Sequence, residues 1–139
     1  MTGYWFKSTL FQIEPDEDVE VNPGRYGRQL AFWLKAKLEQ RGFEIQDVFP
    51  EDWGWCVRCH AKPFQLWVGC GNMDDAVTLS EDVLPLGESV IWHCFPVAEV
   101  PPLAKLFGKI DAAPALARLD AAVLEILDVE PAIQRVDAP

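Results

Sequence analysis

The sequence predicts an α+β fold, a two-layer sandwich in which an antiparallel sheet of about five strands carries two main helices. Two segments with helical periodicity lie near the ends of the chain, and several short segments of alternating apolar and polar residues lie between them. With 139 residues, half of them hydrophobic, the chain can bury a core without disulfides or metals. We therefore expect a single domain over residues 1–139.

The first helix is expected from Pro23 to Arg41. Asn22 is suited to cap its start, and Pro23 has the fixed φ favoured in a first helical turn. Gly42 can close the helix in the left-handed conformation. Apolar side chains recur at helical spacing and form a face that can lie on a sheet: Tyr26, Leu30, Trp33, Leu34 and Leu38.

Strands are expected at residues 6–14, 43–49, 53–61, 64–70 and 89–97. The last of these is apolar on both sides apart from His93, which is typical of a strand in the middle of a covered sheet. A short helical turn at 103–107 and a second helix at 111–129 follow, and residues 131–139 are expected to be a frayed tail. The order β-α-β-β-β-β-α resembles the TATA-binding-protein-like fold, which implies a curved sheet with helices on one face.

The formal charge of −10 comes from 22 acidic and 12 basic residues. Such a charge argues against electrostatic binding to nucleic acid or to an anionic membrane, and makes a basic protein partner more plausible. No apolar run approaches the roughly 18 residues of a membrane span, and no signal peptide is readable. We therefore expect a cytoplasmic protein whose four cysteines are free thiols.

The segment Pro50–Cys70 holds three of the six tryptophans and three of the four cysteines. Strand alternation predicts that one side faces the core, with Trp53, Trp55, Val57 and Cys59. The opposite side then carries Cys56, Arg58 and His60. On the next strand Trp67 is out of phase with its apolar neighbours, so we expect it on this second face too.

The run Cys56-Val-Arg-Cys59-His60 matches the pattern by which c-type haem is attached. A zinc site is the alternative, with ligands from Cys56, Cys59, His60, Cys70 and Cys94. On a regular strand, however, Cys56 and Cys59 project to opposite faces. We favour the interpretation that the thiols are small buried hydrophobic groups, and we expect no cofactor.

No complete catalytic arrangement can be built from the sequence. It contains no Gly-x-Ser-x-Gly, phosphate loop or His-Glu-x-x-His, and Cys56 and His60 are spaced too far apart along a strand to share a hydrogen bond. We therefore expect a non-enzymatic, acidic interaction protein of the immunity or regulatory type that binds a basic partner. The candidate partner-binding residues are Asp16, Glu17, Asp18, Glu51, Asp52, Arg58, His60 and Trp67.

Two other functions remain open on the sequence alone. One is a metal- or thiol-dependent protein that uses Cys56, Cys59 and His60. The other is a protein with a small-ligand pocket between the sheet and the helices.

Several motifs in the first half of the chain resemble a small bacterial family of uncharacterised proteins. They are Asn22-Pro23-Gly24, Tyr26-Gly27-x-x-Leu30-Ala31-x-Trp33-Leu34, Gly42 and the run Pro50-Glu51-Asp52-Trp53-Gly54-Trp55. The resemblance implies a bacterial cytosolic origin. It carries no activity and no functional residues to this chain.

Overall fold

A computed structural model describes residues 3–21, 24–73, 89–108 and 110–139. The described residues form an α+β fold, with one antiparallel sheet of six strands, two main helices and two short helical segments. Its elements are β1 Tyr4–Ser8, the 3-10 turn η1 Glu17–Val19, α1 Arg28–Gln40, β2 Asp47–Glu51, β3 Gly54–His60, β4 Gln65–Asn72, β5 Trp92–Glu99, α2 Pro102–Phe107, α3 Ala113–Val129 and β6 Ile133–Val136.

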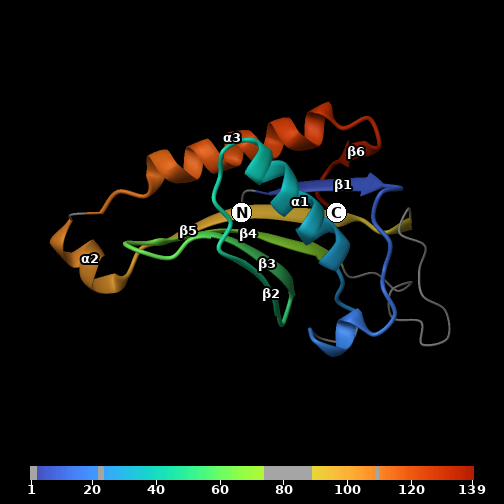
Figure 1. The fold of residues 1–139 in the computed structure, drawn as a ribbon, viewed down its shortest axis with the longest axis horizontal. Helices are drawn as coiled ribbons and strands as arrows, with labels where there is room; N and C mark the ends of the chain where they lie inside the picture. The colour runs from blue at the N-terminus through green and yellow to red at the C-terminus, as the bar shows by residue number, and fades with distance from the viewer. Residues whose placement is uncertain (1–2, 22–23, 74–88, 109) are drawn as a thin grey trace.

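The sheet has the strand order β2-β3-β4-β5-β1-β6, and each pair of neighbours is antiparallel. Strand β1 comes first in the sequence but lies near one edge, between β5 and β6. Helix α1 packs on β3 and β4, while α3 packs on β5 and β6. Figure 1 shows both helices on the same side of the curved sheet, so the sandwich has two layers.

The expectation of a frayed C-terminal tail was wrong for Ile133–Val136, which form the edge strand β6. After α3 ends, the chain turns back and pairs with β1, and the Ser8 hydroxyl donates a hydrogen bond to the Ala132 carbonyl at 2.8 Å. Ile133 packs against the core. The strand was missed because only its two end residues are apolar, so four residues give almost no periodicity.

Helix α1 begins at Arg28, later than expected, and ends as its sequence predicts. Gly42 has a φ of 89°, and its N–H donates to the Glu39 carbonyl while the N–H of Phe43 donates to the Leu38 carbonyl. These two hydrogen bonds form a Schellman motif. The expected capping residues Asn22 and Pro23 lie outside the described part of the chain.

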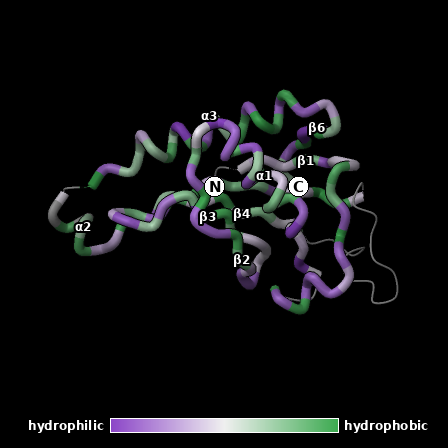
Figure 2. Tube along the Cα trace, in the orientation of Figure 1, coloured by the Kyte–Doolittle hydropathy of each residue, from purple (hydrophilic) through white to green (hydrophobic). Residues whose placement is uncertain are grey.

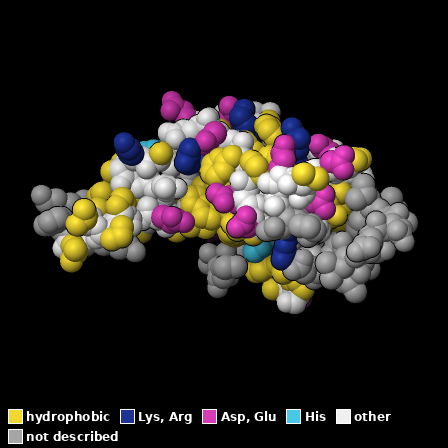
Figure 3. All heavy atoms as spheres, turned by 90° about the horizontal axis from the view of Figure 1, so that it is seen from below, with side chains coloured by type: hydrophobic (Ala, Val, Ile, Leu, Met, Phe, Trp, Pro, Cys, Tyr) yellow, Lys and Arg dark blue, Asp and Glu magenta, His cyan; other side chains and the backbone are white. Residues whose placement is uncertain are grey.

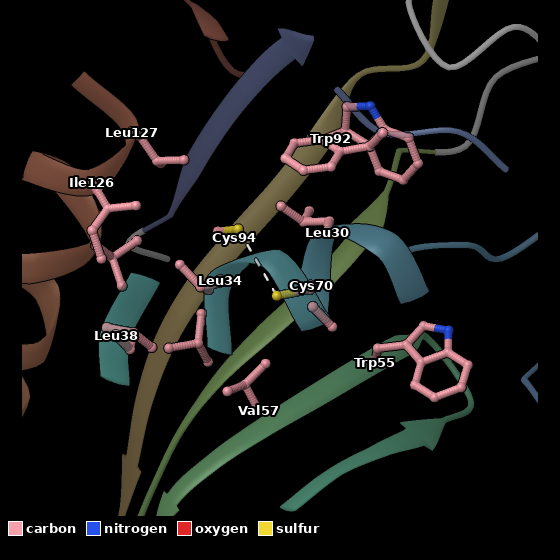
Figure 4. Close-up of a cluster of buried hydrophobic side chains, with 14 of the residues drawn as sticks. Leu30, Leu34, Leu38, Trp55, Val57, Cys70, Trp92, Cys94, Ile126 and Leu127 are labelled. Atoms are coloured by element: carbon pink, nitrogen blue, oxygen red, sulfur yellow. Dashed lines mark hydrogen bonds between the residues drawn. The ribbon is translucent and has the colours of Figure 1, made fainter. Parts of the chain in front are cut away.

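The core lies between the helices and one face of the sheet. Figure 4 shows leucines of α1 pointing toward the sheet and aliphatic side chains of α3 closing the same cluster. The labelled members are Leu30, Leu34, Leu38, Trp55, Val57, Cys70, Trp92, Cys94, Ile126 and Leu127. Figure 2 shows hydrophobic and hydrophilic residues mixed along α3, as an amphipathic helix with one buried face requires.

Candidate functional site: an aromatic row on the outer face of the sheet

The outer face of the sheet, opposite α1 and α3, is set by the register of the central strands. On β4, Leu66 and Val68 belong to the core cluster, so Trp67 between them points outward. Trp67 pairs with Val97 of β5 and with Arg58 of β3. Its out-of-phase position in the sequence therefore predicts its face correctly.

Five rings from β1, β4, β5 and the β2–β3 turn follow one another across this face. We call them the aromatic row: Trp53, Trp67, Phe95, His93 and Trp5. Their ring centroids lie 5.6 Å apart for Trp53–Trp67, 5.9 Å for Trp67–Phe95, 4.8 Å for Phe95–His93 and 4.6 Å for His93–Trp5. Four of the five rings are partly exposed, and His93 is buried.

Glycines on β4 make room for these rings. A Cβ at Gly69 would lie 2.2 Å from the Cζ atom of Phe95, so the Phe95 ring lies directly over the Gly69 backbone. Two strand positions further on, a Cβ at Gly71 would lie 3.1 Å from the Trp53 carbonyl oxygen, so this glycine lets the backbone of the β2–β3 turn approach β4 closely. The missing side chain at Gly69 therefore gives the Phe95 ring its place in the row.

The end of the row at β1 and β5 holds two buried polar atoms. The rings of Trp5 and His93 are stacked, with 6° between their planes. Trp5 Nε1 and His93 Nε2 have no hydrogen-bond partner among the described residues. Burial lowers the pKa of His93, so its imidazole is neutral at pH 7.

The expectation that Trp53 faces the core with Trp55 was wrong. Trp53 occupies the two-residue turn between β2 and β3, where strand alternation no longer applies. Its ring stacks on Trp67 with 21° between the planes and also contacts Phe95 at 5.2 Å. Trp55, the second residue of β3, enters the core as expected.

Acidic side chains lie beside the aromatic row. Glu51 is exposed at the end of β2, and Asp52 is exposed in the turn that carries Trp53. Glu99 is exposed at the end of β5, on the same side as Phe95 and Val97. We call Glu51, Asp52 and Glu99 the acidic rim. Aromatic rings with carboxylates beside them match the interfaces that proteins use for basic partners.

Arg58 lies on the outer face beside Trp67, as expected, but its charge is already compensated. Its guanidinium donates to both carboxylate oxygens of Asp47 at 2.9 and 2.7 Å. It also lies over the ring of Phe49, 5.1 Å from the centroid. The Arg58–Asp47 pair therefore adds no net charge beside the row.

The expected partner-binding role of Glu17 does not fit its position, because Glu17 is only 3% exposed. One of its carboxylate oxygens accepts hydrogen bonds from the N–H groups of Gly27 at 2.7 Å and Arg28 at 3.4 Å, and the other accepts from Glu14 at 2.9 Å. Gly27 is the N-cap of α1, so Glu17 caps this helix from ten residues upstream. Burial raises the pKa of Glu17, and its backbone hydrogen bonds oppose that shift.

The two neighbours of Glu17 lie at the start of α1, not on the outer face. Asp16 is exposed and has a left-handed backbone conformation, with a φ of 67°. Asp18 is partly buried and accepts a hydrogen bond from the Gly24 N–H at 3.2 Å. The acidic run is therefore partly a structural loop that holds the start of α1.

His60 does not share a face with Arg58, because the register shifts between these two residues. This bulge brings both Cys59 and His60 to a cavity on the helix side of the sheet. His60 Nδ1 donates a hydrogen bond to the Phe64 carbonyl at 3.0 Å. The expectation that His60 shares a face with Arg58 assumed regular alternation along the strand, which does not predict a bulge.

The cysteines are poor nucleophiles in this setting. Cys56 lies on the outer face but is only 4% exposed; burial raises its pKa to about 12, and the Glu51 carboxylate adds to the shift. Burial also raises the pKa of Cys59 to about 12. Both are therefore protonated thiols at neutral pH, which are inert compared with thiolates.

The structure does not bring the alternative metal ligands together. Cys70 and Cys94 face each other in the core with their Sγ atoms 4.0 Å apart (Figure 4), whereas Cys56 is on the other side of the sheet. Among the described residues, no group of three His, Cys, Asp or Glu side chains is placed to hold a metal ion.

Three members of the aromatic row, Trp5, His93 and Phe95, were missed by the sequence analysis. Strand β5 is apolar on both faces, which indicated a covered strand, yet its outward Phe95 and Val97 are partly exposed. Trp5 reaches the row only through the pairing of β1 with β5, a contact between the two halves of the chain.

No protein-family model matches this chain, nor does any curated protein sequence or solved structure. None of the described helices is both long and apolar enough to cross a lipid bilayer.

Proposed function

We propose that this chain is a non-enzymatic interaction protein that binds a basic protein partner through the outer face of its sheet. The observation that carries the proposal is the aromatic row beside the acidic rim, with four of its five rings partly exposed. Large rings of this kind supply most of the binding energy in protein interfaces. The role is that of an immunity-type or regulatory protein in the bacterial cytoplasm.

Charge supports a basic partner over a neutral one. The chain carries a net charge of −10, and Asp47 already neutralises Arg58 on the outer face. Glu51 and Asp52 add negative charge beside Trp53, and Glu99 adds it on β5 two positions beyond Val97, the partner of Trp67. Seen from below, the molecule has hydrophobic side chains gathered in the middle, with Asp and Glu side chains beside them and Lys and Arg side chains mainly toward the upper edge of the view (Figure 3).

Rigidity also supports this surface. The stacked rings and the Gly69 contact hold Trp53, Trp67 and Phe95 in place before any partner arrives. A surface ordered in advance loses less side-chain entropy on binding. Aromatic side chains over which a cation can lie also attract lysine and arginine directly.

A photo-crosslinking experiment locates the interface. A benzoylphenylalanine replaces Val97, which is partly exposed next to Trp67, and in a control chain it replaces Phe32, which is 46% exposed on α1. In the native host cells, we expect the Val97 probe to crosslink a protein of basic isoelectric point that the Phe32 probe does not. Equal crosslinking of the same protein from both positions, or from Phe32 alone, would refute the proposed face.

A further inference from the structure

A second candidate site lies on the helix side of the sheet, at the end where the β3–β4 hairpin extends past α1. A cavity of about 440 Å³ opens there between the hairpin, the end of α1 and the first turns of α3. Its volume lies within the usual range for small-molecule sites, roughly 300–1,000 Å³. The lining residues are Gly42, Phe43, Glu44, Cys59, His60, Pro63, Phe64, Leu66, Ala115 and Arg118.

Most of this lining is apolar or aromatic. Phe43 and Leu66 belong to the core cluster, and Phe64 packs against it. His60 is fixed by its hydrogen bond to the Phe64 carbonyl, and its ring lies 5.0 Å from the Phe64 ring. Cys59 contributes a protonated thiol, which behaves as a small apolar group.

Arg118 supplies a cation at this cavity. Its guanidinium lies over the ring of Phe43, 4.3 Å from the centroid, and among the described residues it has no carboxylate partner. Four other arginines pair with carboxylates of the chain: Arg28, Arg41, Arg58 and Arg135.

A second surface hollow of about 500 Å³ lies beside α1 and makes a useful contrast. Leu10 and Phe32 give it an apolar lining, and Arg28 gives it a cation. Arg28, however, lies 3.8 Å from the Glu14 carboxylate and forms an ion pair with it. In the Arg118 cavity, by contrast, the arginine forms no ion pair within the described part of the chain, and the exposed Glu44 is the one carboxylate among the lining residues.

We propose that the Arg118 cavity binds a small amphipathic carboxylate, with its apolar body against Phe43, Phe64 and Leu66 and its carboxylate at the guanidinium of Arg118. A planar guanidinium matches a carboxylate in shape and charge, and stacking on Phe43 holds it in a fixed orientation. This site lies on the opposite side of the sheet from the aromatic row. The ligand site is therefore independent of the proposed partner interface. An experiment can refute the ligand site while the partner interface stands.

Octanoate and 1-octanol test the proposal, because they share an apolar chain and differ in charge. Binding is followed by titration of the isotope-labelled protein in backbone-amide NMR. We expect octanoate to bind about tenfold more tightly than octanol and to shift amides of residues 59–66 and 115–118. Equal affinities, no binding of octanoate, or shifts centred on Leu10 and Phe32 would overturn the assignment.

Two variants and a control separate charge from packing. Arg118→Met keeps an unbranched side chain over Phe43 and is expected to remove the advantage of octanoate, leaving octanol unchanged. Ala115→Phe fills the cavity and should abolish binding of both molecules. Arg135→Met removes an arginine paired with Asp128 on another part of α3 and β6, and should bind octanoate as the wild type does.

Thermal unfolding without ligand shows which variants fold. If Arg118→Met fails to fold, the comparison of octanoate with octanol on the wild type still decides the question, and so does the location of the shifted amides. If Arg118→Met and Arg135→Met both fold and weaken octanoate binding equally, the cation site is wrong.

Discussion

Replacing Gly54 with alanine is expected to lower the free energy of unfolding by about 3 kcal/mol. Gly54 has a φ of 154°, and a Cβ there would lie 2.5 Å from the carbonyl oxygen of Cys70. That oxygen belongs to the β4 backbone and cannot rotate away, so β3 and β4 must separate locally. Equilibrium urea denaturation measures the loss.

Gly42→Ala is the matched control for the Gly54 substitution. Gly42 has a φ of 89°, but no atom lies within 4 Å of the position that its Cβ would occupy. It therefore isolates the cost of the left-handed backbone, about 1 kcal/mol. If the two variants lose the same stability, the close approach of Gly54 to Cys70 is not a constraint on the fold.

Glu17→Ala is expected to lower the free energy of unfolding by about 2–3 kcal/mol. The substitution removes the acceptor of three backbone N–H groups, two of which start α1. Asp18→Ala provides the comparison, since Asp18 accepts one backbone hydrogen bond in a more exposed position, and should cost under about 1 kcal/mol. Similar losses in both variants would show that Glu17 is not the cap of α1.

The same carboxyl group predicts a pH dependence. Because burial raises the pKa of Glu17 above its ordinary value of 4.5, the folded state binds this proton more tightly than the unfolded state. Its contribution to stability is thus fully present below pH 4.5 and falls as the pH rises through the folded pKa. Wild type should lose stability relative to Glu17→Gln over that window, and a gain there would mean that the pKa is lowered instead.

Local patterns in the sequence were enough to predict the fold class. Alternation placed Trp55 and Val57 in the core and Trp67 outside it, and Gly42 marked the end of α1. These signals work because each depends on the period of one element or on the φ of one residue. They left out β6, whose four residues carry almost no pattern.

The candidate surface could be predicted only in part, because contacts between distant residues build it. Strand alternation does not apply to Trp53, because this residue lies in a turn. The bulge after Arg58 places His60 on the helix side of the sheet. Glu17 looked like one more surface acid, since its partners at the start of α1 are ten residues away. In each case the missing information is which segments meet in space.

The central claim is that the aromatic row and the acidic rim form the interface for a basic partner. The most direct test uses the partner that crosslinking identifies, purified without the crosslink, and measures its dissociation constant at low and at physiological salt. The variants are Trp67→Ala, Glu51→Gln combined with Glu99→Gln, and Phe32→Ala as the control. Thermal unfolding checks that each variant folds. The proposal predicts a loss of about 30-fold or more for Trp67→Ala, weaker binding and a smaller salt dependence for the charge variant, and no change for Phe32→Ala. Wild-type affinity in a folded Trp67→Ala, or a wild-type complex that salt leaves unchanged, would contradict it.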